Sequence, residues 1–578
     1  MAETSPCAFP VRGNRQSHAS LLFLAILAIA MALGGSSAAR KSVTTDEFTL
    51  CPNGLLIWRY GAFHLDNGVP PLAKMLLSLP LLLTDARTDA AWVEDHDSGW
   101  RCGRYFAAAN GEHYHYYFFL CRLVSLACFA VLGWMVFVYG RRLYGEWGGV
   151  LAGGLTVLMP TVMALGQLAV TDIFVATTII AACAALDLLL RNPTALRALA
   201  LGTAIGLASL FKYTGILLFA FLPLSAALIF LFGLMKRNRS PGTACHQQQG
   251  AGPDPLFCSR RTKGDDAVIP GQPGIARPLL LREVCLRYEA RAVPRLQAED
   301  HSGNVPYTWN RRTILGVLGA LVWAYVVINL GFTGSGMFQR MDAFSFDTAL
   351  FRGAQNLFPA GFRVPVAGWF LKGIDTQLAE KGYIAYLMGS ANRAGFPHYY
   401  VVALLVKTPL VVLFLCALAA GLRRRIRNNE WLFILPAIGF FLFFSLASHK
   451  NIGVRYVLFL YPVMALWIAR LVDRSAGEAH DETRPWRRHA AWVGLASVLA
   501  IAILEWPHYL PFFNLAAGGN GGGHRIFLDS NLDWGQDLVE LREFMKREQI
   551  EKIDLAYGGR VDPAIYGIQC NMLIDEPT

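Results

Sequence analysis

The stretch CRLVSLACFAVLGWMVFVYGRRLYGEWGGVLAGGLTVLMPTVMALGQLAVTD (residues 121–172) alternates long apolar runs with short polar turns. The runs in and around it cover residues 117–140, 148–166 and 171–190. Each approaches the roughly 20 apolar residues that a helix needs to cross the hydrocarbon core of a bilayer. This part of the chain therefore predicts three successive membrane spans.

The same pattern extends over the whole chain. Of its 578 residues, 54% are hydrophobic and 16% are charged, whereas soluble domains carry about 25% charged residues. The remaining apolar runs are 20–39, 197–212, 214–235, 312–334, 398–420, 431–447, 454–472 and 490–508. The fold class predicted is an all-α polytopic membrane protein with about eleven transmembrane helices. The run VPPLAKMLLSLPLLL (69–83) is shorter and contains prolines, so it predicts an interfacial helix.

The net charge of +11 is concentrated in short segments between the apolar runs. This distribution is typical of loops that orient membrane helices, and it argues against a nucleic-acid partner. It places the N-terminus in the cytoplasm and residues 40–116, 335–397 and everything after about 509 outside. The first apolar run also resembles a signal peptide. Because it is longer than a usual signal-peptide core, we expect it to be a retained span.

Four regions follow from this topology: 1–235, 236–311, 312–510 and 511–578. The first contains the outer loop 40–116, and the third contains the outer loop 335–397, with helical stretches such as IDTQLAEKGYIAYLMG (374–389). The basic, Pro- and Gly-rich region 236–311 predicts a disordered cytoplasmic loop. The last region predicts a small outer α/β unit, with strands HRIFLDS (524–530) and EKIDLAYGG (551–559) on either side of a helix at 535–550. The glycine run at 516–524 predicts a flexible tether.

Ionisable residues collect at the outer ends of the predicted spans: Asp46, Glu47, Lys74, Arg122, Asp172, Lys212 and Arg455. Charges at these depths cost free energy unless they are paired or face a polar cavity. Together they suggest one site, in which cations hold a lipid phosphate and a carboxylate takes a proton from an acceptor. The simpler alternatives are that the lysines extend towards headgroups and that Asp172 caps a helix.

Three further features of the sequence are less specific. Residues 529–540 place Asp529, Asn531, Asp533 and Glu540 at calcium-loop positions, but Trp534 replaces the required glycine, which favours a helix start capped by acids or an acceptor-binding surface. Lys407 lies either within a span or near headgroups. Cys51 and Cys102 share an outer loop, where a disulfide between them can form.

The ordered series TTDEFTL, GVPPLAKMLL, residues 121–172, GLASLFKYTGILL, YYVVALLVKTPL and SHKNIGVRYVLFLYP resembles the family 39 glycosyltransferases. These include protein O-mannosyltransferases and aminoarabinose lipid A transferases. The tail LDSNLDWGQDLVELREF is similar to a bacterial branch described as phospholipid carrier-dependent glycosyltransferases. The match covers roughly 21–233, 312–470 and 524–567.

The resemblance implies the GT-C fold, an inverting transfer on the periplasmic face of a bacterial inner membrane, and a polyprenyl-phosphate sugar as donor. The acceptor is a protein hydroxyl, a lipid or a glycan, and membrane lipids are the other partners. Carried over to this sequence, Asp46 is the expected base, Glu47 its support and Asp172 the second acid. Four cations are expected to bind the carrier phosphate or the sugar: Lys74, Arg122, Lys212 and Arg455.

The sequence departs from the family at Val69, where many members carry a histidine before the two prolines. We therefore predict no metal ligand and no certain cofactor, and leave a divalent metal open. The main rivals are a transporter or lipid flippase and a non-catalytic scaffold of the same fold. A transporter predicts charges along a path through the bilayer, whereas here they gather at one face.

Overall fold

The computed structural model describes residues 13–94, 99–238, 307–359, 361–380, 383–422, 425–448, 450–473 and 485–573. The loop predicted at 236–311 therefore lies almost entirely outside the described residues.

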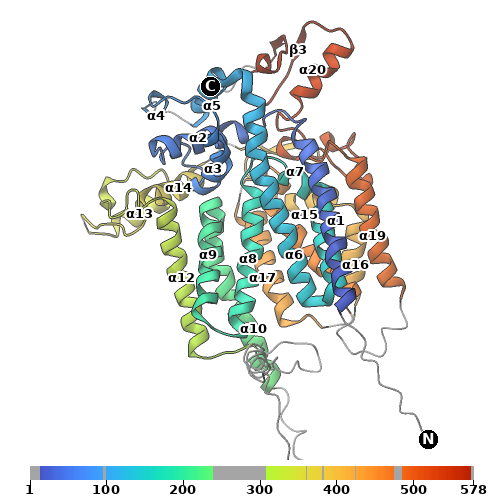
Figure 1. Cartoon of the computed structure of the whole chain (residues 1–578). Coiled ribbons are helices and arrows are strands. Elements are labelled where there is room, and N and C mark those ends of the chain that lie inside the picture. Colours follow the sequence, from blue (N-terminus) through green and yellow to red (C-terminus); the bar gives the residue numbers. More distant parts are fainter. Residues whose placement is uncertain are drawn as a thin grey trace, which may run out of the picture.

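The molecule is a bundle of long helices with a layer of short elements at one end, the upper end in Figure 1. We call this end the site end. It carries α2, α3 and α5 of the N-terminal half together with α20 and β3 of the C-terminal part. The helices are α1 Gly13–Ala38, α2 Glu47–Tyr60, α3 Pro71–Ser78, α4 Ala91–Glu94, α5 Gly99–Asn110, α6 Tyr114–Leu158, α7 Pro160–Gly166, α8 Asp172–Arg191, α9 Ala195–Phe211, α10 Leu218–Asn238, α12 Arg311–Gly331, α13 Ala349–Asn356, α14 Gly368–Ala379, α15 Tyr399–Lys407, α16 Leu410–Ala420, α17 Asn428–Leu442, α18 Leu460–Ala469, α19 Trp486–Leu504 and α20 Leu538–Arg547. The strands are β1 Ala385–Leu387, β2 Ser390–Asn392, β3 Ile553–Leu555 and β4 Cys570–Met572.

Within the described residues, 7 helices are long and apolar enough to cross a membrane, and 8 if the bent pair α15–α16 counts as one span. Three shorter apolar helices cover Pro71–Leu83, Ala195–Phe211 and Leu460–Val472. The prediction of a mostly helical, multi-pass membrane protein is confirmed. The number of eleven spans stays a prediction.

Residues 121–172 contain a tight helical hairpin. α6 consists of two helical arms that meet at a kink at Gly145, whose φ of +79° is a conformation that favours glycine. The two arms then pack so closely that a Cβ on Gly149 would lie 2.6 Å from the carbonyl oxygen of Phe137. The glycine-rich turn thus separates the two spans predicted at 117–140 and 148–166.

Lys407 ends α15 at a bend of 109° before α16. Its side chain is buried, and Nζ donates hydrogen bonds of 2.7 Å to the carbonyl oxygens of Leu510 and Asn531. It therefore lies inside the protein and contacts the C-terminal region, which neither sequence interpretation anticipated.

The predicted C-terminal unit is only partly correct. α20 and β3 form where a helix and a strand were expected, and β3 pairs in parallel with β4, which was not predicted. The expected strand at 524–530 is wrong, because short 3₁₀ turns replace it. Phe527 of this stretch is buried against Tyr399, with ring centroids 4.8 Å apart, so tertiary packing outweighs the strand pattern.

The glycine run at 516–524 is not a free tether. It begins in a 3₁₀ turn, Leu515–Ala517, capped by the side chain of Asn514. The same side chain donates to the carbonyl oxygens of Leu405 and Thr408 at 2.6 and 2.8 Å. The run is therefore attached to the bend between α15 and α16.

Two further expectations are wrong. Cys51 and Cys102 do not form a disulfide: the thiol that interacts with Cys51 is Cys121 of α6, and Cys102 donates to the carbonyl oxygen of Trp92. The helical stretch predicted at 374–389 ends with α14, and an antiparallel hairpin of β1 and β2 follows.

Candidate functional site

The site is centred on an ion pair between Asp46 and Arg455. Asp46 immediately precedes α2, and its Oδ2 lies 2.5 Å from Nη1 of Arg455. The Arg455 side chain is 9% exposed and that of Asp46 is 32% exposed, so the carboxylate is the more open partner. The guanidinium carbon lies 4.3 Å from the ring centre of Trp534, which holds the arginine from the other side.

A second ion pair lies beside the first. Asp172, the first residue of α8, lies 2.7 Å from Nζ of Lys212, which follows α9. The ring of Tyr456 joins the two pairs, because Lys212 lies 4.2 Å and Arg455 5.5 Å from its centre. The helix-cap alternative for Asp172 is wrong, since the capping position is Thr171 and no side chain caps the helix.

A narrow cavity adjoins the two ion pairs and is lined by Asp172, Lys212, Arg455 and Tyr456 together with apolar residues that include Phe440 and Phe444. Two buried polar atoms of these lining residues have no hydrogen-bond partner within the described part of the chain, Oδ2 of Asp172 and Nε of Arg455. Unsatisfied buried polar atoms are costly, and at a cavity they are typical of a site that receives a polar ligand.

Glu47 makes a different kind of pair, with Arg122 of α6. Both side chains are 0% exposed, and the distances are 2.6 Å from Nη2 to Oε2 and 2.7 Å from Nε to Oε1. Arg122 also donates to the carbonyl oxygens of Ala38, Lys41 and Ser42. This pair ties the end of α1 to the loop that carries Asp46.

The Glu47 carboxylate is saturated with hydrogen bonds. Oε1 accepts the amide of Ala169 at 2.7 Å, and Oε2 accepts the amide and hydroxyl of Thr44 at 2.9 and 3.0 Å. Burial opposes ionisation, but the charge of Arg122 and these hydrogen bonds outweigh it and lower the pKa of Glu47. Glu47 is thus held as an anion with no free lone pair for an acceptor.

Lys74 of α3 is 1% exposed and donates to the carbonyl oxygens of Leu65 and Asp66 at 3.0 and 2.9 Å. It fixes the turn between α2 and α3. Asp66, within this turn, has φ of +51°, and burial raises its pKa to about 6, opposed by the charge of Lys74 and assisted by that of Asp46. Asp66 therefore adds a second, half-buried acid close enough to Asp46 to act on it electrostatically.

The outer loop between α12 and α15 also contributes polar groups. Lys450 lies 2.5 Å from Oε2 of Glu380 and donates to Gln377 at 3.0 Å, while Tyr383 donates to Oε1 of Glu380. The charge of Glu380 acts on both Tyr456 and Asp66, which places it at the same site. Neither Glu380 nor Tyr383 was predicted from the sequence as a site residue.

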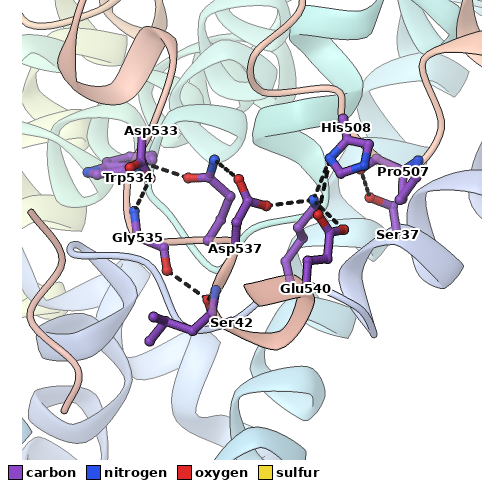
Figure 2. A network of polar contacts seen from close by, with 12 residues as sticks. Ser37, Ser42, Pro507, His508, Asp533, Trp534, Gly535, Asp537 and Glu540 are labelled. Atoms are coloured by element: carbon purple, nitrogen blue, oxygen red, sulfur yellow. Dashed lines mark hydrogen bonds and ion pairs between the residues drawn. The ribbon is translucent and has the colours of Figure 1, made fainter. Parts of the chain in front are cut away.

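Residues 529–538 of the C-terminal region form another side of the site, and we call them the C-terminal wall. Its backbone runs along the loop that carries Asp46: the amide of Ser42 donates to Gln536 at 2.9 Å and the amide of Thr45 donates to Trp534 at 3.0 Å. The Ser42 hydroxyl donates to the carbonyl oxygen of Gly535 and accepts the amide of Leu538 (Figure 2). The wall brings Trp534 onto Arg455.

The described residues contain one group of three potential metal ligands, His508, Asp537 and Glu540. They turn toward a common point (Figure 2), and Nζ of Lys41 lies 3.1 Å from His508, 2.8 Å from Asp537 and 3.1 Å from Glu540. Since an ammonium group already supplies the cation there, this group does not fit a metal.

The calcium-loop interpretation of residues 529–540 is also unsupported by the geometry. Asn531 accepts the amide of Val454, Asp533 accepts that of Gly535, and Glu540 contacts Lys41. The side chains thus face different partners.

The structure brings four of the seven predicted residues together: Asp46 pairs with Arg455, and Arg455 lines one cavity with Asp172 and Lys212. Glu47, Arg122 and Lys74 lie behind it with their charges turned to backbone groups or to each other. Trp534 and Tyr456 were not predicted as site residues. Tyr456 directly follows Arg455 in the sequence, but nothing in the sequence indicated that the C-terminal region reaches Arg455.

The fold and site define a multi-pass helical membrane protein with paired charges around a cavity at one end of the bundle. Residues 116–243 match the model of the family described as dolichyl-phosphate-mannose-protein mannosyltransferase. This match confirms the resemblance expected from the sequence. No curated protein matches the chain significantly.

Two solved structures of one protein are similar to the chain, both of ArnT from Cupriavidus metallidurans. The structure with undecaprenyl phosphate is 13% identical, covers 94% of this chain and 74% of its own, and has a TM-score of 0.44. The apo structure is 11% identical, covers 96% and 86%, and has a TM-score of 0.43. Scores of this size are too low to support an argument about this chain.

Proposed function

We propose that this protein is a GT-C glycosyltransferase that moves a sugar from a polyprenyl-phosphate carrier to an acceptor hydroxyl or amine at the site end of the bundle. The observation that carries the proposal is the pairing of the partly open Asp46 with the buried Arg455 beside the Asp172–Lys212 pair. A base and two phosphate-binding cations around one cavity are the groups that such a transfer needs. The family match over 116–243 supports the same class of reaction.

In this mechanism the anomeric carbon of the sugar forms a bond to the acceptor while its bond to the carrier phosphate breaks. Asp46 takes the proton of the acceptor, and the configuration at the anomeric carbon is inverted. Arg455 and Lys212 stabilise the negative charge on the departing phosphate, an electrostatic role that is strongest in a water-poor site. Asp172 orients Lys212 and balances its charge before the donor arrives.

Asp46 and Arg455 contact each other in the structure, so donor binding must change this pair. A phosphate accepts two parallel hydrogen bonds from a guanidinium group, as a carboxylate does. When the phosphate takes over Arg455, the Asp46 carboxylate becomes free to face the acceptor. The resting ion pair thus keeps both groups in place until the donor binds.

Glu47, Arg122 and Lys74 act in this proposal as positioning residues. Their contacts fix the two ends of the segment that carries Asp46 and the turn that carries Asp66. Arg122 and Lys74 were expected to bind phosphate, but their exposures of 0% and 1% leave no surface for it. We assign the phosphate to Arg455 and Lys212.

The proposal places the site at the periplasmic face of a bacterial inner membrane, in accord with the charge bias of the loops. It leaves protein, lipid and glycan acceptors as candidates.

The test is a donor panel. The purified full-length protein is incubated with polyprenyl-phosphate sugars that differ in the sugar, together with acceptor extracts, and release of the free carrier phosphate is followed by mass spectrometry. We expect acceptor-dependent release from at least one donor. If folded protein releases carrier from none of them, the proposal is wrong and a transporter or scaffold becomes the better description.

A further inference from the structure

The C-terminal wall is fixed to the membrane bundle at both of its ends. At one end, Lys41, 2% exposed, holds Asp537 and Glu540 (Figure 2). At the other end, Ser530 is buried and its hydroxyl donates to the carbonyl oxygen of Ile452. The wall is therefore a built part of the site and does not belong to a separate domain.

Asn531 makes the attachment at this second end rigid. Its side chain accepts the amide of Val454 at 2.9 Å and donates to the Tyr399 hydroxyl at 2.8 Å, while its carbonyl oxygen accepts from Lys407 at 2.7 Å. With 0% exposure, Asn531 has its side-chain amide and its carbonyl oxygen engaged inside the protein. The two residues after Asp529 are thus held to three different elements.

Asp529 itself is different from these neighbours. It is exposed, and its φ of +59° is a left-handed conformation that costs a non-glycine residue free energy. One carboxylate oxygen accepts the amide of Ser530, and no ion pair to Asp529 is formed within the described ranges. A rigidly held, strained residue with an open carboxylate is the arrangement expected of a group that meets a ligand.

The neighbours of Asp529 hold it close to Arg455. Ser530 donates to the carbonyl oxygen of Ile452, and Asn531 accepts the amide of Val454, the residue before Arg455. Arg455 and Asp46 also act electrostatically on the Asp529 carboxylate. In the proposed reaction the sugar lies between the phosphate held by Arg455 and the acceptor facing Asp46. The Asp529 carboxylate is therefore near the part of the site that the sugar enters.

We infer that Asp529 binds hydroxyl groups of the transferred sugar and so contributes to the choice of sugar. The inference rests on the proposed function. A carboxylate accepts hydrogen bonds from two neighbouring hydroxyls, and a polar site that loses such a partner discriminates strongly against the altered substrate. Asp529 is, on this basis, a substrate-binding residue supplied by the C-terminal wall.

The test compares wild type with Asp529→Asn. Asparagine keeps the hydrogen bond to the Ser530 amide and tolerates the left-handed backbone, while its neutral amide accepts hydroxyl hydrogen bonds less strongly. Kinetics are measured with the donor that the wild type uses and with a series of its deoxy analogues, each lacking one hydroxyl. Asp554→Asn, an exposed acid on β3, is the control.

We expect Asp529→Asn to lower kcat/KM for the intact donor about 10- to 100-fold, as for the loss of a hydrogen bond to a charged group. With one deoxy analogue the two proteins become nearly equal, because the hydroxyl that Asp529 binds is missing. The control keeps wild-type values with every donor.

The inference is overturned if Asp529→Asn has wild-type kinetics, or if its defect is the same with every deoxy analogue. Should this variant fail to fold, Asp529→Gly retains the backbone conformation and gives the same comparison. A wild-type protein that uses no donor would instead overturn the proposed function, so the two failures are distinct.

Discussion

Asp46 and Glu47 are neighbours in the chain, and each pairs with an arginine, yet the two pairs have opposite surroundings. The Glu47–Arg122 pair is 0% exposed on both sides, and its carboxylate accepts further hydrogen bonds from Ala169 and Thr44. The Asp46 carboxylate is 32% exposed and contacts Arg455, which lines a cavity. Two neighbouring acids thus differ in their surroundings: Glu47 is a buried anchor, whereas Asp46 keeps a partly exposed carboxylate.

The largest expected effect is that of Asp46→Asn on activity. Loss of a general base lowers the rate about 10²- to 10⁴-fold, and asparagine keeps the shape of the side chain. We expect kcat to fall by this factor while the melting temperature in detergent changes little. Near-normal turnover by a folded variant would exclude Asp46 as the base.

Arg122→Met breaks the buried pair and is expected to act on stability. Removing one partner of such a pair leaves an uncompensated buried charge and costs about 3–5 kcal/mol. The double variant Arg122→Met, Glu47→Leu removes both charges and should recover part of that loss. Thermal unfolding of purified protein measures both changes. A single variant as stable as wild type would show that Glu47 and Arg122 do not anchor the loop.

Asp172→Asn tests the second ion pair of the site, between Asp172 and Lys212. The change leaves Lys212 in place but removes the negative charge that orients it at 2.7 Å. We expect an increase of about tenfold in KM for the lipid donor, with a smaller change in kcat, because a less well-oriented cation binds phosphate less well. Steady-state kinetics at varied donor concentration give both values. A pure kcat effect would place Asp172 in the chemical step.

Asp66→Asn is expected to have the smallest effect, and it depends on pH. The pKa of Asp66 is raised from its ordinary 3.8 to about 6 by burial, so the folded state ionises it less readily than the unfolded state does. Below about pH 3 the carboxyl group is mostly protonated in both states and costs almost nothing. As pH rises from there to 6 the unfolded state gains stability relative to the folded one.

Asp66→Asn should therefore raise the free energy of unfolding by about 1 kcal/mol at pH 7–8, with almost no gain at about pH 3. Melting temperatures of wild type and variant across this range test the sign. A gain that is equal at both pH values would mean that ionisation of Asp66 is not its cause.

Much of the site was predictable because membrane proteins pay a high cost for isolated charges near the bilayer. That argument selected Asp46, Asp172, Lys212 and Arg455; the structure places the last three around one cavity and pairs Asp46 with Arg455. It could not separate Asp46 from Glu47, since burial depends on which backbone amides of a distant turn reach the carboxylate. The same argument grouped Arg122 with the phosphate-binding cations although three carbonyl oxygens and Glu47 surround it.

The fold was predictable where periodicity and length decide it, as in the hairpin around Gly145. The C-terminal wall was not. Its residues were predicted as the end of a strand and the start of a helix, and the contacts that fix it come from Ser42, Val454 and Lys407, which lie far away in the sequence. Hydropathy carries no information about such polar pairings.

The contact between Ser42 and Leu538 joins positions 496 residues apart. The loop that carries Asp46 is therefore synthesised well before its partner. The helical bundle can assemble progressively during translation, but this end of the molecule is completed only when residues 529–538 have been made and have docked. Until then Arg455 lacks its contact with the ring of Trp534.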